Sequence, residues 1–68
     1  MRRERLLAAL RDLARERRVA FMVNEGRGKG SHYRVTVGDR TTTIKSGDLS
    51  PRYVELILKQ LGLPKDAV

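Results

Sequence analysis

The stretch that decides the fold is His32-Tyr33-Arg34-Val35-Thr36-Val37-Gly38-Asp39-Arg40-Thr41-Thr42-Thr43-Ile44-Lys45. Apolar and polar residues alternate on both sides of the Gly38-Asp39 pair, as they do in half-buried strands. A Gly-Asp pair between two such segments is typical of a two-residue hairpin turn of type I′ or II′. The stretch therefore predicts an antiparallel β-hairpin in which Val37 lies opposite Arg40.

The register that follows from this turn divides the hairpin side chains between two faces. One face is expected to join the core, and it carries Tyr33, Val35, Val37, Thr42 and Ile44. The other face is expected to stay open and polar, and it carries His32, Arg34, Thr36, Thr41, Thr43 and Lys45. A slip by one residue would expose the apolar set instead, which disfavours any other register. The prediction thus places His32 opposite Lys45 and on the same surface as Arg34.

The segment before the hairpin predicts a helix and a further strand. Residues 2–18 carry an apolar stripe at helical spacing, formed by Leu6, Leu7, Leu10, Leu13 and Ala14. Residues 19–23 are rich in β-branched and aromatic side chains, which predicts a strand with Val19, Phe21 and Val23 facing the core. Residues 24–31 then read as a loop that contains three glycines.

The segment after the hairpin predicts a second helix. Ser50 and Pro51 suit the N-cap and the first helical position. An apolar stripe follows, made of Val54, Ile57, Leu58 and Leu61. Gly62 is expected to end the helix, and residues 65–68 are expected to fray.

The predicted order is therefore helix, three strands, helix. Each helix has one apolar stripe and the sheet has one apolar face, so both helices are expected to cover that same face. The expected fold is α+β, a two-layer αβββα sandwich with a three-stranded antiparallel sheet, similar in shape to a double-stranded-RNA-binding domain. Residues 1–68 are expected to form a single domain, because so short a chain cannot build a second core.

Composition narrows the classes of partner. Lys and Arg number 15 against 8 acidic residues, and the resulting net charge of +7 favours polyanionic partners: nucleic acid, an acidic membrane surface or an acidic protein. No cysteine and only one histidine are present, so neither a metal site nor a cofactor is expected. No apolar run approaches the length of a membrane span and no secretory signal pattern opens the chain, so a cytoplasmic location is expected.

The glycine-rich loop fits neither of two common phosphate-binding patterns. The Walker spacing before the Gly-Lys pair is absent, and a dinucleotide fingerprint requires a helix after the loop, where this sequence predicts a strand.

Several segments resemble the HicA toxins of bacterial type II toxin–antitoxin systems. They are Gly28-Lys29-Gly30-Ser31-His32-Tyr33, the hairpin from Val35 to Ile44, Asp48-Leu49-x-Pro51, and Ile57-Leu58-Lys59-Gln60-Leu61-Gly62-Leu63. The resemblance implies a metal-independent mRNA interferase that is held inactive by a HicB-type antitoxin, with His32 as the catalytic residue. Lys45 departs from the family, whose members commonly carry proline there, and so does the beginning of the second helix. The chain alone is expected to be a monomer.

RNA cleavage without a metal needs a base for the 2′-OH proton and cations for the phosphorane, and these roles fit the residues around His32. Histidine ordinarily titrates near neutral pH and suits the base. Phosphate binding is assigned to Lys29, Gly30, Ser31, Arg34 and Lys45. With no second histidine, the acid would be water, Lys29 or Lys45. The alternative is a non-catalytic RNA-binding module of the same fold, although the second helix lacks the basic start expected of a double-stranded-RNA binder.

Overall fold

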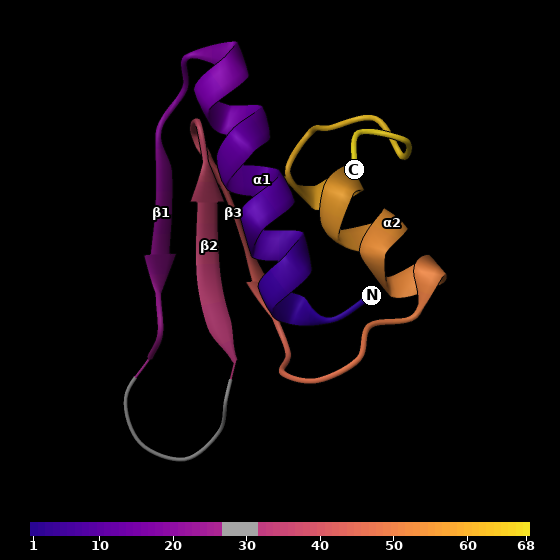
Figure 1. Ribbon diagram of the computed structural model, residues 1–68. Helices are drawn as coiled ribbons and strands as arrows, with labels where there is room; N and C mark the ends of the chain where they lie inside the picture. Colours follow the sequence, from indigo (N-terminus) through magenta and orange to yellow (C-terminus); the bar gives the residue numbers. More distant parts are fainter. Residues whose placement is uncertain (27–31) are drawn as a thin grey trace.

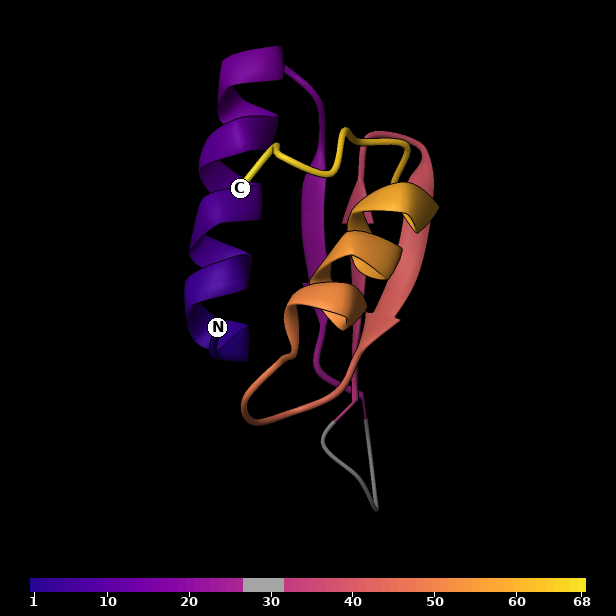
Figure 2. The same ribbon diagram turned by 90° about the vertical axis from the view of Figure 1, so that its right-hand side faces the viewer.

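The computed structural model describes residues 1–26 and 32–68, and it confirms the predicted α+β architecture (Figure 1). The elements follow the order α1 (Arg3–Arg17), β1 (Phe21–Asn24), β2 (Tyr33–Val37), β3 (Arg40–Ile44) and α2 (Pro51–Gln60). The strands form one antiparallel sheet in the order β1-β2-β3. Seen from the side, both helices lie over the same face of the sheet and leave the other face open (Figure 2).

The hairpin has the predicted register. Tyr33 pairs with Ile44, Val35 with Thr42 and Val37 with Arg40. Gly38 has a φ of +67°, whereas Asp39 is not among the residues with positive φ. A positive φ at the first turn position alone defines a type II′ turn, so the structure selects one of the two predicted types.

The core lies between the sheet and the two helices, and it is made almost entirely of aliphatic side chains. Full burial of one such side chain stabilises the folded state by roughly 1.5–3 kcal/mol. The buried apolar residues are Leu6, Leu10, Ala14, Val35, Val37, Ile44, Leu49, Val54, Ile57, Leu58 and Leu61. The predicted stripe of α2 is buried in full, whereas Leu7 and Leu13 of α1 are only half-buried.

Strand β1 begins two residues later than predicted, and the assignment of Val19 to the core is wrong. Arg18 adopts a left-handed conformation with a φ of +59°, and the N–H of Val19 donates to the carbonyl of Ala14 at 2.9 Å. This turn ends α1 and leaves Val19 in the connection to β1, where it is 41% exposed.

Helix α2 begins and ends as its sequence predicts. The Ser50 hydroxyl accepts a hydrogen bond from the backbone N–H of Tyr53 at 3.2 Å, which is the N-cap interaction. At the other end, Gly62 has a φ of +73° and the N–H of Leu63 donates to the carbonyl of Leu58 at 2.8 Å.

The C-terminal segment, which was predicted to fray, has a defined turn in the structure. It turns back, with the N–H of Ala67 donating to the carbonyl of Pro64 at 3.0 Å. Ala67 is half-buried and packs against the core, so apolar contact holds a segment that has no helix or strand of its own.

The loop before α2 is tied to the start of α1. The N–H of Arg3 donates to the carbonyl of Gly47 at 3.1 Å, and the N–H of Leu49 donates to the carbonyl of Met1 at 2.7 Å. These bonds bring the first residues of the chain to the end of the sheet at which β2 begins and β3 ends (Figure 1). No helix in the described part of the chain is long and apolar enough to cross a membrane.

Candidate functional site

The open face of the sheet is a mostly polar surface built from two rows of cross-strand neighbours, with Met22 as its exposed apolar residue. One row is Met22, Thr36 and Thr41, and the other is Asn24, Arg34 and Thr43. The hydroxyls of Thr36 and Thr41 are hydrogen-bonded at 2.8 Å. Arg34 is the single charged residue in the two rows, so this surface favours anions.

His32 lies at one end of this face. Strand pairing ends at Tyr33 and Ile44, so His32 and Lys45 both stand one residue outside the ladder. The side chain of His32 is exposed, as is that of Arg34 two residues further along the chain. An exposed imidazole at this position is accessible to a large substrate such as RNA.

Lys45 contacts the second helix. Its backbone N–H donates to the hydroxyl of Tyr53 at 3.2 Å, and its ammonium lies 5.0 Å from the centre of the Tyr53 ring. The sequence grouped Lys45 with His32 and Arg34, and the structure instead gives its ammonium a cation–π contact with α2. Among the described residues, no side-chain hydrogen bond or ion pair joins His32, Arg34 and Lys45 to one another.

Three of the predicted phosphate-binding residues belong to the glycine-rich segment before His32. Lys29, Gly30 and Ser31 lie outside the described residues. The residues on either side of this segment are Gly26, with a φ of +72°, and His32. The carbonyl of His32 lies 3.3 Å from where a Cβ on Gly26 would stand, which favours glycine at the entry to the loop.

Arg3 is a further cation near this end of the sheet, and it is not among the predicted site residues. It is only 9% exposed, and its guanidinium carbon lies 3.7 Å from the centre of the Tyr33 ring. This contact joins α1 to β2 one residue beyond His32. The spacing of Arg3, Leu6, Leu10 and Ala14 was the available signal, because it places Arg3 on the buried stripe of the helix.

The site combines an exposed imidazole, an exposed cation on the sheet face and a basic, glycine-rich segment in the sequence just before them. Such a set can accept a proton and bind a phosphate group, and the described part of the open face holds no carboxylate to oppose an anion. Across residues 1–26 and 32–68, no three His, Cys, Asp or Glu side chains are grouped as metal ligands would be.

Comparison of the chain with protein-family models, with curated proteins and with solved structures finds no match.

Proposed function

We propose that this chain is a metal-independent endoribonuclease, the toxin component of a type II toxin–antitoxin system of the HicA kind, with a HicB-type antitoxin as its partner. The observation that carries the proposal is the exposed His32 at the entry to the central strand, directly after the sequence Gly28-Lys29-Gly30-Ser31 and two residues before Arg34. The net charge of +7 suits an RNA substrate.

The proposed reaction is an internal transfer within the RNA. The 2′-oxygen attacks the adjacent phosphorus while its proton passes to the imidazole of His32. The bond from phosphorus to the 5′-oxygen breaks, and that oxygen takes a proton from water or from a lysine ammonium. The products are a 2′,3′-cyclic phosphate and a free 5′-hydroxyl.

Cations stabilise the negative charge that develops on the phosphorane. We assign this role to Arg34, which lies on the open face of the sheet, and to Lys29, which precedes His32 in the glycine-rich segment. Lys45 is a weaker candidate than the sequence suggested, because its ammonium contacts Tyr53. Since the chain has no second histidine to act as the acid, we expect slow turnover.

The test is expression of the chain in bacteria together with cleavage of purified RNA. The wild-type chain should arrest growth and cut RNA in the presence of EDTA, and His32→Ala should do neither. Glu16→Ala, which changes an exposed residue of α1, is the control and should behave as wild type. Full cleavage by His32→Ala, or loss of wild-type cleavage with EDTA, would rule the proposal out.

One observation favours a second function, that of a non-catalytic RNA-binding module. His32 makes no side-chain hydrogen bond to another described residue, whereas a catalytic base is usually oriented by a partner. Under this alternative the chain would bind RNA without cutting it, and its affinity for RNA would fall as the salt concentration rises. The same assay separates the two, because only the nuclease produces cyclic-phosphate ends.

A further inference from the structure

Strand β3 presents a free edge. It is the outer strand of the sheet, and β2 pairs with it on one side only. In a two-residue hairpin the residues next to the turn exchange hydrogen bonds, and alternate residues then point outward. The peptide groups of Thr41 and Thr43 therefore face away from β2. The structure agrees, since the Thr43 carbonyl and the Lys45 N–H both bond to Tyr53, a residue outside the sheet.

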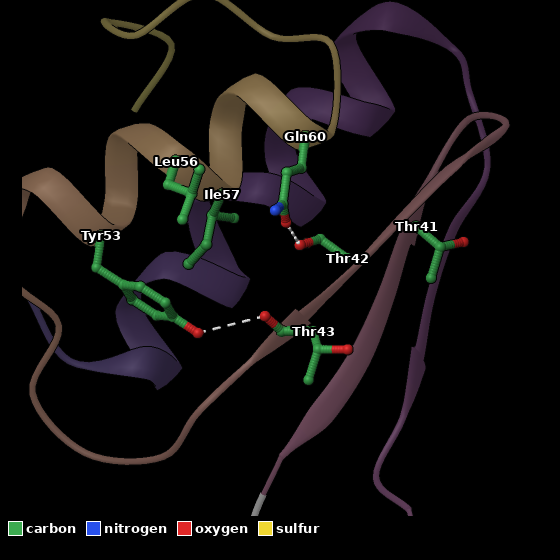
Figure 3. A pocket seen from close by; sticks show the side chains of 7 residues that line it. All are labelled: Thr41, Thr42, Thr43, Tyr53, Leu56, Ile57 and Gln60. Carbon is green, nitrogen blue, oxygen red and sulfur yellow. Dashed lines mark hydrogen bonds between the residues drawn. The ribbon is translucent and has the colours of Figure 1, made fainter.

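Tyr53 takes the place of a neighbouring strand at one end of this edge. Its hydroxyl donates to the carbonyl of Thr43 at 3.3 Å (Figure 3). The same hydroxyl accepts from the N–H of Lys45 at 3.2 Å. Further along the edge, the N–H and carbonyl of Thr41 and the N–H of Thr43 have no hydrogen-bond partner within residues 1–26 and 32–68. Three adjacent backbone groups are thus available to another chain.

A groove runs beside these groups, between β3 and α2. Its volume is about 560 Å³, within the range of pockets that bind ligands. Tyr53, Leu56 and Gln60 form its helical wall, and Figure 3 shows their side chains on the side of α2 toward β3. Leu56 is 48% exposed, which leaves an apolar contact point beside the free edge.

Strand β3 is short and its single charged residue, Arg40, stands beside the turn, so the edge from Thr41 to Thr43 carries neither a charge nor a proline. Its three consecutive threonines favour extended structure. Strand addition by a peptide uses free backbone groups for affinity and a neighbouring apolar surface for specificity, and both are present here.

We propose that the groove between β3 and α2 binds an extended acidic segment of another protein, which adds to the sheet as a fourth strand. The acidic character follows from charge. Arg40 begins β3 and Lys45 follows its last residue. The exposed charged residues of α2 are two cations, Arg52 and Lys59, and one carboxylate, Glu55, and the described residues that line the groove include no carboxylate. A second copy of this chain is a poor occupant, because two chains of charge +7 repel each other.

This inference goes beyond the proposed nuclease activity and does not depend on it. His32 is not part of the groove. A chain that cuts no RNA can still bind the acidic segment, and a chain that cuts RNA can fail to bind it. The two proposals can therefore be disproved separately.

The experiment uses a synthetic peptide of alternating glutamate and valine, about seven residues long as strands commonly are, with blocked ends. Its binding to the full chain is followed by backbone amide NMR shifts. We expect the largest shifts at Thr41, Thr43 and Leu56, and the same affinity for His32→Ala as for the wild type. A peptide of the same length with lysine in place of each glutamate should bind about tenfold more weakly.

Two substitutions at one position test the edge itself. Thr41→Pro removes the outward N–H and keeps the backbone hydrogen bonds between β3 and β2. An edge strand tolerates proline at such a position, because the N–H that is lost faces away from the sheet. Thr41→Val keeps that N–H, and both variants lose the hydroxyl contact with Thr36. Thr41→Pro should weaken peptide binding by about tenfold or more, whereas Thr41→Val should not. The amide spectra of both variants verify that the fold is retained.

Several outcomes would overturn the proposal. They are equal binding by Thr41→Pro and Thr41→Val, peptide-induced shifts at the other edge on Phe21 and Val23, and equal affinity for the lysine–valine peptide. Concentration-dependent dimerisation that protects the Thr41 and Thr43 amides would assign the edge to a second copy. Shifts at these amides with a short RNA and none with the acidic peptide would assign it to nucleic acid.

Discussion

The guanidinium of Arg3 stacks on the ring of Tyr33, with 3.7 Å between the guanidinium carbon and the ring centre. Arg3 belongs to α1 and Tyr33 opens β2, so the contact joins the helix layer to the strand that carries the candidate site. Tyr33 directly follows His32 in the chain, so the contact lies beside the candidate catalytic residue. Two residues that the sequence places 30 positions apart thus share one buried contact at the end of the sheet.

Removing this cation should destabilise the fold. Arg3→Met keeps an apolar stem but loses the attraction to the Tyr33 ring, which is worth about 0.5–2 kcal/mol depending on burial. Arg5→Met changes an exposed arginine in the same turn of α1 and should alter the free energy of unfolding by no more than about 0.5 kcal/mol. Urea denaturation of the two variants makes the comparison. Equal stability of the two would show that the stacked cation contributes nothing.

Thr42 and Gln60 should respond unequally to substitution. The buried hydroxyl of Thr42 donates to the side-chain carbonyl of Gln60, whose own side chain is exposed. Thr42→Val removes the buried polar group and leaves Gln60 free to bond with water, so stability should change little. Gln60→Leu leaves the Thr42 hydroxyl buried without this acceptor, which costs about 1–3 kcal/mol. Thermal unfolding of both variants measures the two changes in stability. A larger loss of stability in Thr42→Val than in Gln60→Leu would contradict the prediction.

Gly62 should tolerate alanine poorly for two separable reasons. Its φ of +73° strains any side chain by roughly 1–2 kcal/mol. In addition, a Cβ there would lie 2.9 Å from Nε of Arg40. Gly62→Ala should therefore cost more in the wild-type background than in Arg40→Ala, by about 0.5 kcal/mol or more.

Gly47 provides a control for this comparison of the wild-type and Arg40→Ala backgrounds. Its φ is +91°, but a Cβ there would meet no atom within 4 Å. Gly47→Ala should consequently cost the same with and without the Arg40 side chain. If the Arg40→Ala background leaves the cost of Gly62→Ala unchanged, the close approach to Arg40 has no energetic effect.

Arg34 should contribute to RNA cleavage under the proposed function. Replacing a buried transition-state donor typically lowers activity by about 10²-fold, but Arg34 is exposed and screened by salt, so about tenfold is expected for Arg34→Met. Arg17→Met is the control, because Arg17 is exposed and lies near Gly38 at the opposite end of the sheet. Cleavage rates measured at two salt concentrations should show a larger effect of Arg34→Met at low salt. An equal effect of both substitutions would indicate a general loss of charge and no role for Arg34 at the site.

The parts of the fold that could be predicted were those governed by short-range rules. The turn at Gly38-Asp39 set the pairing of β2 with β3, because a two-residue loop allows one register and side chains alternate with a period of two. Ser50 and Gly62 marked the limits of α2 for similar reasons, since a hydroxyl cap and a left-handed residue act within one helical turn.

The parts that could not be predicted depend on one local turn and on contacts between distant segments. Val19 looks like a core residue by composition, but the left-handed Arg18 ends α1 early and leaves Val19 exposed. Residues 65–68 carry no helix or strand signal, and the packing of Ala67 against the core is a contact that their sequence does not indicate. Lys45 was placed by alternation alone, which ends where the strand ends, and beyond that point the Tyr53 ring determines where its ammonium lies.

Local pattern is thus sufficient to predict the order of elements, the hairpin register, the two-layer α+β fold and the exposure of His32 and Arg34. The burial of Arg3 against Tyr33, the capping of β3 by Tyr53 and the groove beside the free edge were decided by the packing of the helices on the sheet. The physical reason is the distance along the chain over which each kind of interaction acts. Turn chemistry and side-chain alternation act between neighbours in the chain, whereas these contacts exist only once segments far apart in sequence have been brought together by burial of the core.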